Sequence, residues 1–210
     1  MNVQKYLDYL KDIFLYKAIE RELSGCKTVL DVGCGKNSPL RNIKKTFYSE
    51  GIDIHEVSLK ESMKKKIHDK YIKEDIRKLK KHYKEKTFDS VIALDVIEHL
   101  KKNEALELIK NMENIAKNKI IILTPNGYQD QDELWGNPYQ KHLSAWHISD
   151  LEQLGYDVRG LRGLKFLRDH AEIKFRPWIL WGLISFISEP LLYFIPQLSY
   201  HLFAVKTKNP

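Results

Sequence analysis

The stretch VLDVGCGKNSPL, residues 29–40, combines an apolar run, an acid and a glycine turn. The run ends at Asp31, turns through Gly33 and Gly35, and meets a Ser-Pro pair, which favours the start of a helix. Glycines at such a turn let the backbone approach a ligand with no Cβ in the way. This arrangement is typical of a ligand-binding strand–helix junction in an α/β sheet.

Outside this stretch, apolar strands alternate with helix-like segments along the chain. Periodicity predicts helices over residues 3–23, 38–45, 104–116 and 148–154. Strands are predicted over residues 28–32, 47–54, 71–76, 90–94, 119–126, 155–161 and 199–208. Some of these strands are apolar throughout, as expected for strands buried on both faces. The alternation predicts a doubly wound α/β sheet.

The composition fits one globular domain. Hydrophobic residues make up 43% and charged residues 30% of the 210, enough for a real core. The net charge of +7 favours an anionic partner, such as nucleic acid, a phosphorylated substrate or an acidic membrane face, or reflects a solvated lysine-rich surface. Two cysteines make no disulfide framework, and the first residues lack the apolar core of a signal peptide. We therefore expect a cytoplasmic protein.

Acidic residues follow four of the predicted strands. Asp31, Asp53, Asp75 and Asp95 fall at or just after strand ends, so we expect them at one edge of the sheet. Asp53 lies 20 positions after the first glycine of the turn, the spacing at which an acid reaches ribose hydroxyls. A dinucleotide site would place a third glycine where this chain has a serine. The acids therefore predict a nucleoside pocket without a pyrophosphate cradle.

Four motifs together resemble the class I S-adenosylmethionine (SAM)-dependent methyltransferases, in particular small-molecule methyltransferases of the ubiquinone-pathway type. They are VLDVGCG, GIDI, KEDI and FDSVIALDVIEHL, and the resemblance covers residues 28–156. It implies a Rossmann-like, seven-stranded, mostly parallel sheet with an antiparallel last strand and helices on both faces. It also implies SAM as cofactor and S-adenosylhomocysteine as product.

The same resemblance assigns nine residues to the cofactor. Asp31, Gly33 and Gly35 are expected at the methionine end, and Asp53 at the ribose. Ile54, Asp75 and Ile76 are expected at the adenine, and Leu94 and Asp95 at the sulfonium.

The acceptor chemistry is expected near residues 95–100, DVIEHL, and in the long loop within residues 124–151. Loops of this size are usually functional. For a hydroxyl acceptor, a histidine there would act as general base, with His142 the first candidate and His99 the second. Each histidine has the alternative of being a surface or hydrogen-bonding residue. The loop also carries four aromatic residues, Tyr128, Trp135, Tyr139 and Trp146.

A metal-dependent alternative rests on Asp95, Glu98, His99 and His142, whose oxygen and nitrogen atoms suit a divalent ion. The set resembles that of the small-RNA 3′-terminal 2′-O-methyltransferases, although Asp95 stands where that family has a glutamate. We favour a site without metal, and no RNA-binding module is apparent in the sequence, so nucleic acid is not the expected partner.

The segment 176–196, RPWILWGLISFISEPLLYFIP, is close to the length of a membrane span, but Glu189-Pro190 interrupts it. The residues after it alternate like a closing strand, so no transmembrane span is expected. The segment is interpreted as a pocket cap, a homodimer contact or a peripheral membrane element. The expected single domain, 1–210, comprises an N-terminal helix (1–25), a cofactor-binding core (28–161), a hydrophobic insertion (162–197) and a closing strand (198–208).

These features together predict O-methylation of a small or of a lipid- or glycan-linked metabolite. The alternatives are a metal-dependent RNA 3′-terminal 2′-O-methyltransferase and a SAM-binding domain without catalytic activity.

Overall fold

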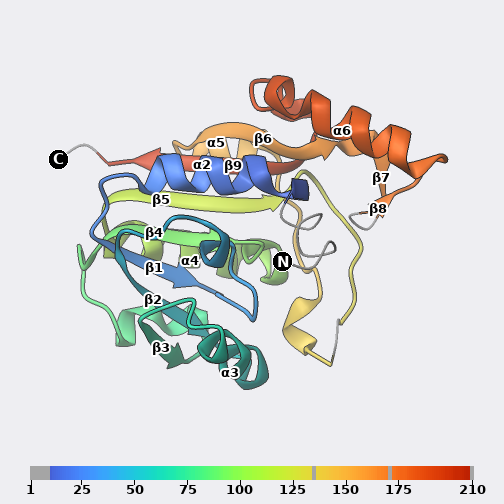
Figure 1. The fold of residues 1–210 in the computed structure, drawn as a ribbon. Helices are drawn as coiled ribbons and strands as arrows, with labels where there is room; N and C mark the ends of the chain where they lie inside the picture. The colour runs from blue at the N-terminus through green and yellow to red at the C-terminus, as the bar shows by residue number, and fades with distance from the viewer. Residues whose placement is uncertain (1–9, 134–135, 170–171, 209–210) are drawn as a thin grey trace.

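A computed structural model describes residues 10–133, 136–169 and 172–208 (Figure 1). One seven-stranded sheet forms the centre, with strands in the order β3-β2-β1-β4-β5-β9-β6. Its strands are β1 Thr28–Val32, β2 Tyr48–Asp53, β3 Lys70–Lys73, β4 Phe88–Leu94, β5 Ala116–Pro125, β6 Asp157–Leu164 and β9 Ser199–Thr207. The helices are α2 Ile13–Leu23, α3 Glu56–Lys64, α4 Lys102–Ile115, α5 Ile148–Gln153 and α6 Trp178–Leu192.

The sheet is parallel except at β9. Strand β1 pairs in parallel with β2 and β4, whereas β9 runs antiparallel between β5 and β6. This confirms the predicted class: a Rossmann-like, mostly parallel sheet with an antiparallel last strand. The winding reverses between β1 and β4, which places a ligand site at the carboxyl ends of these strands.

Helices cover both faces of the sheet (Figure 1). On one face, Ile19 of α2 packs in a buried cluster with Val29 of β1. On the other face, Met112 of α4 belongs to a cluster that contains Leu30 of β1. Neighbouring residues of β1 therefore bury on opposite faces, which explains why this strand carries apolar residues on both faces, with Thr28 and Asp31 as its polar residues.

Three expectations require correction or restriction. The predicted helix 38–45 is a single 3₁₀ turn, Pro39–Asn42, because the chain becomes extended at Ile43. Helix α3 was not anticipated from its polar sequence. The first residues of the predicted helix 3–23, and Trp135, lie outside the described residues.

The insertion between β6 and β9 contains a short hairpin, β7 Arg168–Asp169 and β8 Glu172–Ile173, followed by α6. Just before this insertion, the register of the β6–β9 pairing shifts between Leu161 and Leu164. In the described part of the chain, we find no helix with the length and apolar character that a membrane crossing requires.

Candidate active site

A cavity of about 730 Å³ opens at the carboxyl ends of β1, β2 and β4. All nine residues assigned to the cofactor from the sequence line it: Asp31, Gly33, Gly35, Asp53, Ile54, Asp75, Ile76, Leu94 and Asp95. Residues far apart in the sequence thus meet at one site, as the strand-end pattern predicts.

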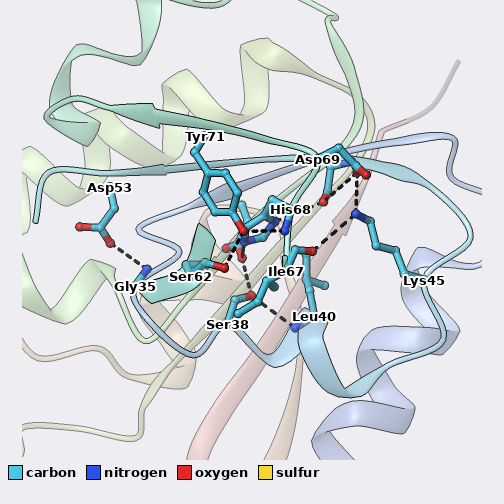
Figure 2. A network of polar contacts seen from close by, with 12 residues as sticks. Gly35, Ser38, Leu40, Lys45, Asp53, Ser62, Ile67, His68, Asp69 and Tyr71 are labelled. Atoms are coloured by element: carbon cyan, nitrogen blue, oxygen red, sulfur yellow. Dashed lines mark hydrogen bonds and ion pairs between the residues drawn. The ribbon is translucent and has the colours of Figure 1, made fainter. Parts of the chain in front are cut away.

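Both carboxylate oxygens of Asp53 accept hydrogen bonds from backbone N–H groups. One carboxylate oxygen accepts from the Gly35 N–H at 2.8 Å (Figure 2). The other accepts from the His55 N–H at 2.7 Å. Gly33 has φ +69°, and a Cβ there would lie 2.7 Å from a methyl of Val96. The acid and the turn therefore fix each other, and only glycine fits at position 33.

Asp31 is buried and belongs to a polar network with Ser38 and His68, both of which Figure 2 labels. Its carboxylate accepts from the Ser38 hydroxyl and lies 3.3 Å from Nε2 of His68. The other ring nitrogen of His68 lies 3.2 Å from the Ser49 hydroxyl. Burial raises the pKa of Asp31 to about 7 and lowers the pKa of His68 to about 4. The pair therefore favours a protonated acid beside a neutral imidazole.

The Asp75 carboxylate is hydrogen-bonded to Arg77, two residues further along the chain. It accepts from the Arg77 guanidinium at 2.6 and 3.0 Å, and this bond lowers the pKa of Asp75. The carboxylate still borders the cavity, but an adenine amino group would share it with Arg77.

Asp95 joins a cluster that the sequence did not reveal. Its carboxylate accepts from the Arg162 guanidinium at 2.8 Å, and that guanidinium also donates to Asp12 at 3.1 Å and to Nε2 of His201 at 3.1 Å. Burial raises the pKa of Asp95, but Arg162 and His201 outweigh it and hold that pKa well below its usual range. Arg162 lies beyond the predicted strand 155–161, and β6 also carries Asp157 and Arg159, so no distinctive signal in the sequence pointed to this cluster.

Glu98, His99 and His142 form a second cluster. One ligand atom from each lies within 4.8 Å of the others. The Nδ1 atoms of His99 and His142 lie 3.2 and 2.7 Å from the carbonyl oxygens of Lys141 and Gln129. A carbonyl only accepts, so each Nδ1 carries the proton and each Nε2 keeps its lone pair.

Within this second cluster, His99 lines the cavity and His142 lies behind it, with 4.9 Å between the ring centroids. The four-residue metal set of the metal-dependent alternative is therefore incomplete, because Asp95 is bound to Arg162 and does not join the cluster. Trp146, one of the four aromatic residues of the long loop within residues 124–151, is fully buried in the core and does not line the cavity.

Comparison with known proteins identifies the family. Residues 30–124 match the family model described as a methyltransferase domain, and this segment contains β4 and most of the cavity wall. Over residues 30–124 the chain matches the methyltransferase domain, and its fold is that of the class I SAM-dependent methyltransferases. SAM is the cofactor of this methyltransferase.

The methyltransferase shares its fold with solved structures. A SAM-dependent methyltransferase from Archaeoglobus fulgidus is 22% identical, with a TM-score of 0.61 over 97% of this chain and 99% of that chain. The methyltransferase domain of bacterial CtHen1-CN is 18% identical, with a TM-score of 0.57 over 96% and 100%. Magnesium protoporphyrin IX methyltransferase from Synechocystis PCC 6803, with bound SAM, is 16% identical, with a TM-score of 0.54 over 97% and 80%. Identities this low establish the fold alone, and no curated protein matches the sequence.

Proposed function

We propose that this methyltransferase methylates a hydroxyl of a small acceptor, or of an acceptor linked to a lipid or glycan. The observation that carries the proposal is the orientation of His99, which borders the cavity with its Nδ1 proton committed to the Lys141 carbonyl. Its Nε2 is therefore a proton acceptor. Burial and the neighbouring His142 lower the pKa of His99, which keeps the ring neutral near pH 7.

SAM, when bound, supplies a methyl group on a positively charged sulfur. His99 would take the hydroxyl proton at Nε2 while the oxygen–carbon bond forms and the carbon–sulfur bond breaks. His142, whose Nδ1 donates to the Gln129 carbonyl, packs behind the His99 ring and limits its rotation. The main contribution of the chain is to hold the acceptor oxygen in line with the methyl group.

The acceptor side of the cavity favours an apolar or aromatic molecule. Tyr139 and Leu143, from the loop after β5, border the cavity and are each 48% exposed. Tyr16 of α2 closes the cavity from another side. These side chains would cover a ring or an isoprenoid chain and leave its hydroxyl to His99.

The test is methyl transfer from labelled SAM to a panel of phenols, quinols, polyprenyl-linked sugars, amines and RNA oligonucleotides. We expect product from a hydroxyl acceptor, insensitivity to EDTA, and at least a hundredfold loss of kcat in His99→Gln with an unchanged SAM affinity. Lys110→Gln, an exposed lysine on α4 away from the cavity wall, is the surface control. Transfer only to amines, or full activity in His99→Gln, would contradict the proposal.

A second candidate is a metal-dependent 2′-O-methyltransferase acting on RNA 3′ ends. The observation that favours it is the convergence of Glu98, His99 and His142. Two imidazole nitrogens and a carboxylate oxygen suit Mn²⁺, Fe²⁺ or Zn²⁺. In that case these side chains would hold the ion, and the ion would bind the ribose hydroxyls.

Calorimetric titration with Mn²⁺ separates the two candidates without any acceptor. The second candidate expects binding that is lost in both His142→Ala and Glu98→Gln. It also expects methylation of an RNA oligonucleotide that EDTA abolishes. Absence of Mn²⁺ binding by the wild-type protein would remove it.

A further inference from the structure

Helix α6 is buried on one side only. Its buried residues are Ser185, Glu189 and Leu192, which face β6. The opposite side faces solvent, and α6 projects beyond the end of the sheet (Figure 1). The helix is therefore apolar on the side that packs and also on the side that does not.

Exposed apolar side chains concentrate around this helix. In the described part of the chain, 12 of the 19 exposed large hydrophobic residues lie between positions 166 and 198. We call these 12 the apolar face: Phe166, Phe175, Trp178, Ile179, Leu180, Leu183, Ile184, Phe186, Ile187, Leu191, Phe194 and Leu198. Exposed apolar side chains gathered this densely in one segment mark an interaction surface.

The apolar face carries no negative charge along the helix. The one ionisable acid between positions 177 and 198 is Glu189, which is 5% exposed. Its carboxylate points inward and accepts from the backbone N–H groups of Arg162 and Gly163. The acid of this helix therefore attaches α6 to β6 and adds no charge to the exposed side.

Cations border the apolar face at both ends. Lys174 and Arg176 are exposed just before the helix, with Glu172 the nearby acid on the hairpin. At the other end, the Arg159 guanidinium lies 5.8 Å from the Tyr193 ring centroid, and Arg159 also pairs with Asp157.

Arg21 adds a further cation at this second end. Its guanidinium lies 5.1 Å from the Tyr193 ring centroid, and it also pairs with Glu22. Lys174 and Arg176 thus provide the clearest excess of positive charge.

We propose that the apolar face docks this protein on an anionic lipid membrane, with α6 lying flat in the headgroup region. Fifteen residues make a helix about 22 Å long, shorter than the hydrocarbon core of about 30 Å, so α6 lies on the bilayer and does not cross it. Aromatic residues at both helix ends and cations beside them are the features that place a helix at this depth. A second copy fits less well, since its equivalent cations would meet these.

The apolar face is connected to the cavity. The Phe186 ring of α6 contacts the Phe14 ring of α2, with 5.2 Å between centroids. Asp12 and Tyr16, on either side of Phe14, border the cavity. Docking would thus hold the cavity beside the lipid surface. The proposal of membrane docking does not depend on methyl transfer. The further idea that the acceptor is lipid-linked rests on the proposed function.

Cosedimentation of the full chain with vesicles tests the proposal. We expect binding to vesicles of phosphatidylcholine with 30% phosphatidylglycerol, at least tenfold tighter than to phosphatidylcholine alone. Ile187→Glu should lose at least tenfold in vesicle affinity, and Leu106→Glu, an exposed leucine on α4, should bind like wild type. SAM binding by calorimetry, unchanged in both variants, shows that each variant is folded and separates docking from catalysis.

Bromine-labelled acyl chains provide a second measurement, since they should quench the fluorescence of exposed Trp178, and Trp178→Phe should reduce that quenching. Three results would overturn the proposal. They are no binding of wild type to anionic vesicles, equal binding of Ile187→Glu and wild type, and a wild-type dimer that Ile187→Glu dissociates without any vesicle binding.

Discussion

The Arg162 guanidinium donates to the Asp95 carboxylate at 2.8 Å, and both residues have left-handed backbone conformations, with φ +63° and +57°. Non-glycine residues rarely adopt such angles, and they do so mainly where surrounding contacts enforce them. Here Glu189 of α6 accepts from the Arg162 backbone N–H at 2.6 Å, at the register shift of β6. The irregular strand thus directs an arginine into the cavity and ties α6 to it.

Replacing Arg162 by methionine should destabilise the fold and leave Asp95 without its main partner. We expect the free energy of unfolding to fall by about 1–3 kcal/mol, less than for a dry ion pair because Asp95 reaches solvent through the cavity. Urea denaturation measures the change. Arg159→Met, which breaks the more exposed pair with Asp157, should cost less than about 1 kcal/mol. Equal losses would contradict the assigned role of Arg162.

Asp53→Ala should abolish SAM binding. The variant loses the acid expected to bind the ribose and the acceptor of the Gly35 N–H, so we expect affinity to fall at least 30-fold. Calorimetry with SAM and S-adenosylhomocysteine measures it. Asp132→Ala, an exposed acid outside the cavity, is the control. Wild-type affinity in Asp53→Ala would show that the cofactor binds elsewhere.

Asp31 and His68 should contribute opposite pH dependences to stability. The folded pKa of Asp31 is raised, so its contribution is full below about pH 3.8 and is lost as pH rises to about 7. The folded pKa of His68 is lowered, so its contribution is full above about pH 6.5 and is lost as pH falls to about 4.

Urea denaturation between pH 4 and 6.5 should separate these contributions. Relative to wild type, the unfolding free energy of His68→Gln should decrease as pH rises, and that of Asp31→Asn should increase. Each slope should differ from wild type by up to about 1.4 kcal/mol per pH unit. Parallel curves for the two variants would contradict this account.

SAM affinity should rise with pH because Asp31 must give up its proton to face the methionine ammonium group. With a pKa of about 7 for Asp31, we expect about a tenfold rise between pH 5.5 and pH 7, where the ammonium stays charged. Calorimetry in buffers of different ionisation enthalpy should detect the released proton. Asp31→Asn should bind weakly and without this pH dependence. A flat wild-type profile would place Asp31 away from the ammonium.

That the residues assigned to the cofactor would line one cavity was predictable, because they lie at or just after strand ends, and parallel strand ends converge on one edge. Asp53 and the glycine turn needed only local spacing. Asp95 and Asp12, the partners of Arg162, lie 67 and 150 residues from it in the sequence. The contact of His68 with Asp31 joins the loop before β3 to strand β1. Such long-range pairs leave no periodic signal. Trp146 shows another limit of the sequence, because its position in a polar loop gave no sign that it is fully buried in the core.

The place of β9 between β5 and β6 has an evolutionary consequence. The chain leaves the sheet after β6 and must return to it, so the excursion that contains α6 is fixed at both ends by strand pairing. Its sequence can therefore diverge while the strands that hold the cofactor remain under separate selection. Exchanging this one excursion would change the surface beside the cavity and leave the strands beneath it in place.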